Sequence, residues 1–348
     1  MINEPEITLR KKFRDILDRK YVGAPLVGTV TTAGLLELMD ITGAIRPEAD
    51  RDPKKMVKLA GSLHTVANFE VIRYPFDVTV LGEAMGCNID PGTKARTPAI
   101  VSHPFEDNPE AIDVPPDLPG RGRIPVILEV SKLLRSKEGE EIPIVAGLEG
   151  PADLASYLCG MRYFLKWTIQ KPQLAREIVD KCIDICILYA NALIDSGADA
   201  VVIADATASP DIMGPDAFIE FIKPGLIRFT DSVDGHCIIH VCGKTDSIIP
   251  DLLDCGFNAI SVEESVEDLS RIVDLAHKKN TAVIGNISTS ITLFSKTADD
   301  VREESMICLE KGVDILAPGC GIAPESPLKN LLAMVEARDE YSYSEQGQ

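Results

Sequence analysis

Five apolar segments in the second half of the chain constrain the fold most. They span residues 198–204, 237–241, 258–262, 281–285 and 313–317, and a segment with helical spacing follows each of them. A continuous apolar run is typical of a parallel strand that is buried on both faces. The alternation of such strands with helices predicts a parallel sheet that is covered by helices.

Three further strands are expected in the first half of the chain, at residues 25–30, 77–81 and 142–146. Eight strands joined by short helical crossovers favour a closed (β/α)8 TIM barrel over an open doubly wound sheet. No strand is followed by a G-x-G-x-x-G turn or a P-loop sequence, so the fingerprints of the common nucleotide-binding folds are missing. We therefore expect an α/β protein whose catalytic domain is a barrel over residues 23–341.

Three segments lie outside this alternation. Residues 6–20 mix charged and apolar side chains at helical spacing, which predicts an N-terminal helical extension within residues 1–22. A Pro-rich insertion lies near residues 86–122, after which the alternation of strand and helix resumes. The polar residues 342–348 are expected to form a flexible tail.

Charge and cysteine content exclude several classes of protein. The 54 Asp and Glu residues outnumber the 35 Lys and Arg residues, and the net charge of −19 opposes binding to a nucleic-acid backbone. The chain has no apolar stretch long enough for a membrane span and no apolar leader, so we expect no membrane and a cytoplasmic location. The nine cysteines are scattered and odd in number, which predicts free thiols rather than a disulfide framework.

The candidate catalytic residues follow the predicted strands, at the end of the barrel where such enzymes carry their active sites. His240 and Cys242 are two positions apart in one strand, so both side chains point to the same face. Cys320 follows the last strand between Gly319 and Gly321, and these glycines allow a close approach of the backbone. One imidazole and two sulfurs form a donor set for zinc with a fourth position left open.

The H-x-C pair alone is a weak signal, and its place at a strand end gives it weight. In the alternative interpretation, His240 hydrogen-bonds a backbone carbonyl while Cys242 and Cys320 pack as small apolar side chains. Core packing is also expected for Cys182 and Cys186, which lie four residues apart on an apolar helix face.

Three more polar residues follow predicted strands. Glu263 is the candidate for the fourth zinc ligand, with an ion-paired or solvated rim residue as the alternative. Asp205 would either support a ligand histidine through a hydrogen bond or cap the helix that follows it in the chain. Asn286 would bind the substrate or a backbone group.

Several short sequences together resemble the uroporphyrinogen decarboxylase superfamily and, within it, the methylcobamide:coenzyme M methyltransferases of methanogens. The resemblance runs over nearly the whole chain. The motifs that carry it are EAMGC at 83–87, GRGRIPV at 120–126, EGP at 149–151, HVCG at 240–243, SVEE at 261–264 and APGCG at 317–321.

The resemblance implies a (β/α)8 barrel with zinc held by His240, Cys242 and Cys320, which would be the catalytic residues. It also implies transfer of a methyl group from a methylated corrinoid protein, as methyl-Co(III), to the thiol of coenzyme M (2-mercaptoethanesulfonate) in methylotrophic methanogenesis. The R-Q-A-G-R sequence of the decarboxylase branch has no counterpart here, which counts against a porphyrinogen substrate. The corrinoid is expected on a partner protein, because residues 234–239 have Ile in place of the Gly of a D-x-H-x-x-G motif.

Several alternatives stay open at the level of sequence. The acceptor could be homocysteine or a pterin, or the chain could be a metal-free decarboxylase-like protein or a noncatalytic subunit. The insertion at 86–122 would be either a docking surface for the corrinoid protein or a capping loop. The sulfonate of coenzyme M requires a local donor, either backbone N–H groups at a helix N-terminus or a single Arg or Lys.

Overall fold

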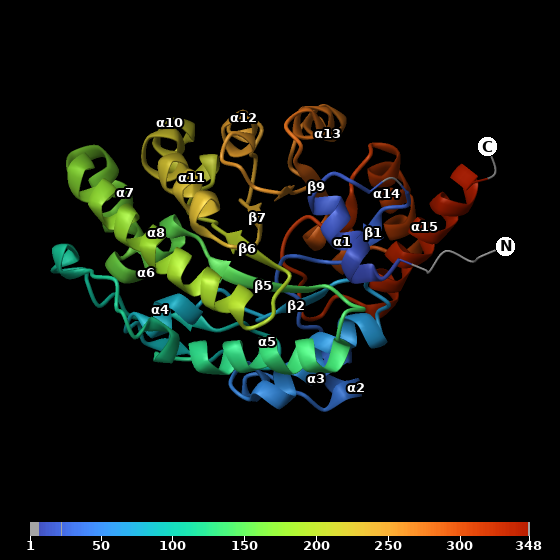
Figure 1. The fold of residues 1–348 in the computed structure, drawn as a ribbon, viewed down its shortest axis with the longest axis horizontal. Helices are drawn as coiled ribbons and strands as arrows, with labels where there is room; N and C mark the ends of the chain where they lie inside the picture. Colours follow the sequence, from blue (N-terminus) through green and yellow to red (C-terminus); the bar gives the residue numbers. More distant parts are fainter. Residues whose placement is uncertain (1–6, 22, 347–348) are drawn as a thin grey trace.

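An eight-stranded parallel sheet forms the centre of the protein in a computed structural model that describes residues 7–21 and 23–346. The order of the strands is β1-β10-β9-β8-β7-β6-β5-β2, so neighbours in the sheet follow the order of the chain. Helices surround the strands in an outer ring (Figure 1). The strands are β1 Leu26–Val27, β2 Ile72–Tyr74, β5 Ile144–Glu149, β6 Ala200–Ala204, β7 His236–His240, β8 Ala259–Ser261, β9 Ala282–Ile287 and β10 Ile315–Pro318.

The two outer strands of this order, β1 and β2, meet and close the barrel. The backbone N–H of Glu70 donates to the carbonyl of Val27 at 2.7 Å, and the Glu70 carboxylate accepts from the Val27 N–H at 2.8 Å. Gly28 permits this approach, because a Cβ atom there would lie only 2.9 Å from the Cβ of Val71. The predicted (β/α)8 TIM barrel is confirmed.

The helices begin where the sequence offers suitable first-turn residues. Proline occupies the first turn of α3, α5, α6 and α8, where its missing N–H leaves no hydrogen bond unmade. Thr297 and Asp300 form a reciprocal capping box at the start of α14. The α-helices are α1 Leu9–Leu17, α2 Leu36–Thr42, α3 Pro53–Thr65, α4 Val80–Ala84, α5 Ile124–Glu138, α6 Pro151–Cys159, α7 Met161–Gln170, α8 Pro172–Asp195, α9 Pro210–Met213, α10 Pro215–Ala217, α11 Lys223–Ser232, α12 Ile249–Leu253, α13 Leu269–Lys278, α14 Ala298–Glu310 and α15 Leu328–Gln346.

Short helical turns and one hairpin complete the described elements. The turns η1 Glu48–Asp50, η2 Pro109–Ala111 and η3 Leu118–Gly120 are 3-10 helices, whereas η4 Phe218–Ile222 and η5 Thr289–Leu293 are π-helices. The Pro-rich insertion contains an antiparallel pair of strands, β3 Ile89–Asp90 and β4 Ala99–Ile100.

The interior of the barrel is a core of its own, separate from the larger core between strands and helices. Its strand residues alternate with residues that face the helices, as the two-residue period of a strand requires. They are Leu26, Val30, Val71, Val145, Ala200, Val202, Ile238, Ala259, Ala282, Ile284, Ile315 and Ala317. Three side chains of α1, namely Phe13, Ile16 and Leu17, belong to this same interior cluster.

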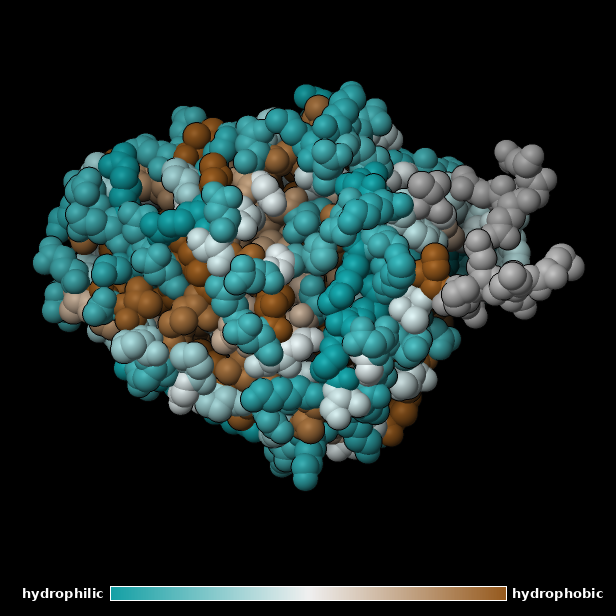
Figure 2. Space-filling model, viewed as in Figure 1, coloured by the Kyte–Doolittle hydropathy of each residue, from teal (hydrophilic) through white to brown (hydrophobic). Residues whose placement is uncertain are grey.

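Helix α1 closes the amino-terminal end of the barrel. Arg10 and Arg19 pair with Asp199 and Asp314, which stand directly before β6 and β10. The outer face of α1 is charged, and hydrophilic side chains predominate over it in the space-filling view (Figure 2). The carboxyl ends of the strands are thus the end of the barrel that α1 leaves uncovered.

Two predicted elements differ from the structure. The strand predicted at 77–81 is wrong: the second barrel strand is β2, and residues 80–84 form helix α4. The apolar and β-branched residues of this segment favoured a strand, but the Asp77 carboxylate accepts from the Thr79 N–H and hydroxyl, which folds the chain into a turn there. In the predicted tail, α15 continues to Gln346, while residues 347 and 348 lie outside the described residues, as do residues 1–6 and 22 of the extension.

The structure also shows where two cysteines pack and how long and apolar the helices are. Cys182 and Cys186 are fully buried on α8, as expected for core packing. Across the described residues, every helix is too short or too polar to traverse the apolar interior of a bilayer.

Candidate metal centre

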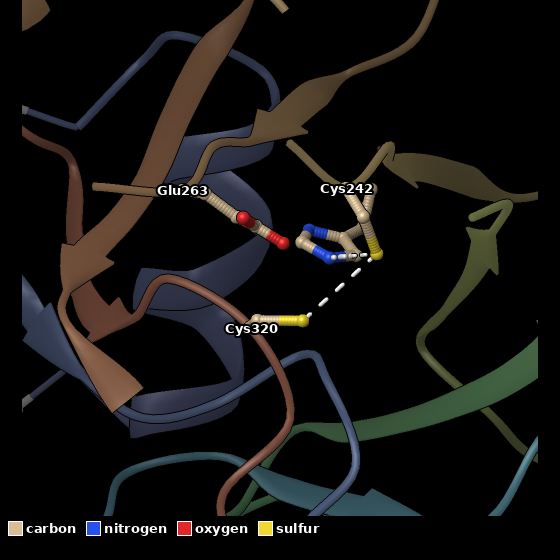
Figure 3. A group of neighbouring side chains, drawn as sticks. Cys242, Glu263 and Cys320 are labelled. Carbon is tan, nitrogen blue, oxygen red and sulfur yellow. Dashed lines mark hydrogen bonds between the residues drawn. The ribbon is translucent and has the colours of Figure 1, made fainter. Parts of the chain in front are cut away.

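Four side chains converge at the carboxyl end of the barrel. His240 ends β7 and Cys242 lies two residues beyond it, while Glu263 follows β8 and Cys320 follows β10. One ligand atom from each of these residues lies within 4.8 Å of one from every other. Cys242, Glu263 and Cys320 point toward one another from separate segments (Figure 3). The structure therefore brings together all four residues that the sequence nominated for metal binding.

The spacing of the donor atoms matches a tetrahedral zinc site. The Sγ atom of Cys242 lies 3.5 Å from Nε2 of His240 and 3.9 Å from Sγ of Cys320. Zinc bonds of about 2.3 Å to sulfur and 2.0–2.1 Å to nitrogen give edges of about 3.8 Å between sulfurs and 3.6 Å between nitrogen and sulfur. Both cysteines are free thiols, since their separation far exceeds the length of a disulfide bond. The residues fit a zinc ion.

His240 is oriented by its neighbour on β8. Its Nδ1 atom lies 3.3 Å from the carbonyl oxygen and 3.2 Å from the hydroxyl of Ser261, the residue that pairs with His240 in the sheet. A carbonyl oxygen can only accept, so we assign the ring proton to Nδ1. The lone pair of Nε2 is then free to point toward the two sulfurs, as a metal-binding histidine requires.

The glycines on either side of Cys320 permit its close approach, as the sequence predicted. A Cβ atom on Gly319 would lie 3.1 Å from Cα of Glu263, and one on Gly321 would collide with the hydroxyl of Thr32. The Thr31 hydroxyl donates to the carbonyl of Cys320 at 2.7 Å. These contacts fix the backbone of Cys320 beside the end of β8.

The electrostatics of the cluster favour a bound cation. A hydrogen bond from the Cys242 thiol lowers the pKa of Cys320 to about 3. The same hydrogen bond, with burial, raises the pKa of Cys242 above its ordinary value. Burial raises the pKa of Glu263 to about 7, and the negative Cys320 sulfur adds to this effect. Burial opposes protonation of His240, but the Cys320 sulfur more than offsets it and raises the His240 pKa.

Asn286 holds the backbone of Glu263. Its Nδ2 atom donates to the carbonyl of Glu263 at 3.1 Å, and its Oδ1 atom accepts from the thiol of Cys308 at 3.3 Å. Of the two roles that the sequence left open for Asn286, the structure places the side chain on a backbone group.

Asp205 does not contact the ring of His240. Its carboxylate accepts from the backbone N–H groups of Ala152 and Asp153, both at 2.9 Å, at the start of α6. Asp153 in turn accepts from the backbone N–H of Thr207 at 2.8 Å, so the two carboxylates join the loops after β5 and β6. Both predicted roles of Asp205 are therefore wrong: it binds the first turn of α6, which precedes it in the chain, whereas Ser209 caps the helix that follows. The residue that orients His240 is Ser261.

Two polar residues of the barrel interior were missed by sequence reasoning. Ser261 could have been found, because strand alternation places it on the same face as Glu263. Arg73 is fully buried on β2 and faces the interior of the barrel. The only signal for Arg73 was one arginine between apolar residues, in a segment that was not assigned to a strand.

The chain belongs to the uroporphyrinogen decarboxylase (URO-D) family, which it matches over residues 8–341. A methylcobamide:CoM methyltransferase, MtaA, of Methanosarcina barkeri is 44% identical over 97% of this chain and 99% of its own length. MtbA of Methanosarcina acetivorans, also a methylcobamide:CoM methyltransferase, is 33% identical with the same coverage. The solved structure of a methyltransferase from Methanosarcina mazei superposes with a TM-score of 0.94, at 43% identity over 97% of this chain and 99% of that one.

These relatives confirm the methyltransferase class that the resemblance implied. They match the chain from end to end, so the candidate metal centre lies within the shared region.

Proposed function

We propose that this methyltransferase moves a methyl group from a methylated corrinoid protein to the thiol of coenzyme M, with zinc held by His240, Cys242 and Cys320. The observation that carries the proposal is the convergence of four donor side chains within 4.8 Å at the carboxyl end of the barrel. The names of the full-length relatives, methylcobamide:CoM methyltransferases, support the choice of substrates.

Zinc at this site would act as a Lewis acid that favours the thiolate form of a thiol substrate at neutral pH. The protein residues decide how reactive that thiolate is. Cys242 and Cys320 contribute two negative charges, which offset the charge of the ion, so the sulfur of the substrate keeps its electron density. His240 contributes a neutral nitrogen, because Ser261 holds its ring proton at Nδ1.

Glu263 would be the fourth ligand of the ion in the absence of substrate, because its carboxylate lies within 4.8 Å of the other three donor atoms. Asn286 fixes the backbone of Glu263 through a hydrogen bond to its carbonyl oxygen. A thiol substrate would bind at this fourth position in place of the carboxylate. The chain therefore offers one exchangeable oxygen donor among two sulfurs and a nitrogen, which is the pattern of a catalytic rather than a structural zinc site.

The transfer itself is a displacement at carbon. The thiol releases its proton to solvent, its sulfur forms a bond to the methyl carbon, and the cobalt–carbon bond breaks with its electron pair left on cobalt. The corrinoid enters on a separate protein. The sequence at 234–239 cannot hold it, because His236 begins β7 at the closed end of the barrel and contacts Asp18 at 2.8 Å.

The test uses the purified full-length chain, methylcobalamin as the methyl donor, and coenzyme M, homocysteine or no thiol as the acceptor. We expect one zinc ion per chain and methylation of coenzyme M well above that of homocysteine. Rapid transfer by a zinc-free preparation would overturn the role of the metal. Preferential methylation of homocysteine would overturn the acceptor and leave the zinc assignment intact.

A further inference from the structure

Arg73 is a buried cation inside the barrel. It lies on β2, two residues after Val71, which belongs to the interior cluster, and its own side chain is 0% exposed. The Nε atom donates to the carbonyl of Val30 at 3.2 Å. The guanidinium covers Gly147 on β5, where a Cβ atom would lie 2.6 Å from Cζ of Arg73. The missing side chain of Gly147 therefore makes the space that the guanidinium fills.

The two terminal nitrogens of Arg73 have no partner. Neither Nη1 nor Nη2 makes a hydrogen bond, and no carboxylate of the described residues forms an ion pair with the side chain. Burial lowers the pKa of Arg73 to about 10, so the group is still a cation at neutral pH. A buried charge whose two terminal NH2 groups have no partner is strongly destabilising unless an anion binds it.

The nearby carboxylates of Asp77 and Glu149 do not form ion pairs with Arg73. Asp77 accepts from both terminal nitrogens of Arg123, at 3.0 and 2.9 Å. Glu149 accepts from the Leu81 N–H at 2.8 Å with one oxygen, and its other oxygen has no partner. Burial raises the pKa of Glu149 to about 7, so this carboxyl is only a partial counter-charge. Among the described residues, the terminal nitrogens of Arg73 are therefore left without an anionic partner.

Arg73 and the candidate metal centre share the same interior. The alternation of side chains directs Arg73 and His240 inward, because Val71, directly before β2, and Ile238, on β7, lie two residues earlier and both belong to the interior cluster. Each residue lies at or next to the carboxyl end of its strand. The strands β2 and β7 are three steps apart in an eight-stranded barrel, so the two side chains face each other across the interior.

We propose that Arg73 binds the acidic end of the thiol substrate, a sulfonate, while the sulfur of the same molecule reaches the metal centre. The planar guanidinium offers two parallel N–H donors, which suit a pair of sulfonate oxygens. This inference rests on the proposed function for the thiol end of the ligand. It adds a requirement that the metal centre alone does not impose, namely that the acceptor is a short thiol with an anionic terminus.

The decisive comparison is between an anionic thiol and its neutral counterpart. With methylcobalamin as donor, we expect Arg73→Met to raise the KM for 2-mercaptoethanesulfonate at least about 100-fold and to change that for 2-mercaptoethanol less than about threefold. Arg73→Lys should recover only part of the loss, because a lysine cannot present two parallel donors. Zinc content should be unchanged in both variants.

A second variant leaves the arginine in place. Gly147→Ala adds a methyl group where the guanidinium lies, and the flexible end of Arg73 must move away. We expect the same selective loss for the anionic thiol, at a smaller scale. An equal loss for both thiols, or no loss for either, would show that Arg73 is only structural and would overturn the inference. If Arg73→Met does not fold, Gly147→Ala and Arg73→Lys decide the question.

A thiol-free ligand separates this inference from the proposed function. Ethanesulfonate has the acidic group but no sulfur nucleophile, and its binding can be followed by ligand-observed NMR titration. We expect binding to the wild-type chain and its loss in Arg73→Met and Gly147→Ala. If no thiol is methylated while ethanesulfonate binding still depends on Arg73, the proposed function fails and the anion site stands. If ethanesulfonate binds equally to the wild type and the variants, the proposed anion site at Arg73 is wrong, and the proposed function is not affected.

Discussion

The two ends of the barrel treat charge in opposite ways. At the amino-terminal end, Asp199 accepts from Arg10 at 2.7 Å and from Arg14 at 3.0 Å, and Asp314 accepts from His277 at 2.9 Å. At the carboxyl end, two sulfurs, an imidazole and a carboxylate lie within 4.8 Å of one another, and that carboxylate, of Glu263, forms no ion pair with a Lys or Arg among the described residues. The charged groups at the amino-terminal end stabilise the fold, whereas those of the metal centre at the carboxyl end can bind a ligand. This is the usual division between the two faces of a TIM barrel.

The largest effect is expected from the closed end. Phe13→Ala removes a fully buried side chain from the interior cluster, and the cavity should lower the free energy of unfolding by about 3–5 kcal/mol. Urea denaturation checks this, with Phe294→Ala, whose side chain is 45% exposed, as the matched control. Equal stability losses in the two variants would mean that α1 does not close the barrel interior.

The next largest effect is expected at the open end, on activity and not on stability. Cys320→Ser removes one of the two sulfurs of the metal centre, and we expect zinc loss and a rate at least about 100-fold lower, because loss of a supporting contact alone costs 10–100-fold. Metal analysis and the methylcobalamin assay measure the two effects. Cys255→Ser, at a cysteine buried away from the site, should keep both zinc and rate. Full zinc and full rate in Cys320→Ser would remove the mechanism.

The charge of Asp77, at the open end, stabilises the fold, and the pH dependence of stability tests this role. Burial raises the pKa of Asp77, but Arg123 more than offsets this and lowers it from 3.8 to about 2. A depressed pKa stabilises the fold above the unfolded-state value, and this contribution of about 2 kcal/mol is lost as pH falls from about 4 through 2. Denaturation measured between pH 5 and 2 should therefore show a steeper decline in wild type than in Asp77→Asn. Parallel curves would contradict the pairing.

The smallest effect is expected at the residue that orients His240. Ser261→Ala removes one of two acceptors for Nδ1, and the backbone carbonyl at 3.3 Å remains. We expect about a tenfold loss of zinc affinity, the lower end of the range for such contacts. Competition with a chromogenic chelator measures it, and Ser295→Ala, at an exposed serine, serves as control. A loss as large as that of Cys320→Ser would make Ser261 a ligand rather than a supporting residue.

The contrast between the two ends also explains what could be predicted from the sequence. The apolar strands buried on both faces were found from their continuous hydrophobic runs, and His240, Cys242 and Cys320 were found because they follow such runs. The strand β2 was missed because it is three residues long and one of them is Arg73. Hydrophobic patterns identify core strands, and a charged side chain that points into a barrel breaks the pattern.

Interactions between distant loops also could not be predicted from the sequence. Asp205 lies at the end of a strand, as catalytic residues do, but its carboxylate is committed to two backbone N–H groups of α6. Nothing in the local sequence specifies that the loop after β5 offers those donors. The role of Ser261, in contrast, could have been predicted. It requires only that β7 pairs with β8 and that side chains alternate along a strand.

The closure of one end of the barrel by α1 affects the order in which the reactants bind and the products leave. Among the described residues, α1 covers the amino-terminal end of the barrel and leaves the carboxyl end uncovered, so under the proposed function both reactants approach from the carboxyl end. The small thiol has to settle at the bottom before a macromolecular carrier covers the opening. Its methylated product can depart only after that carrier lifts away. Under the proposed function, this arrangement predicts a fixed order of loading and unloading, in which the thiol binds first and its methylated product leaves last.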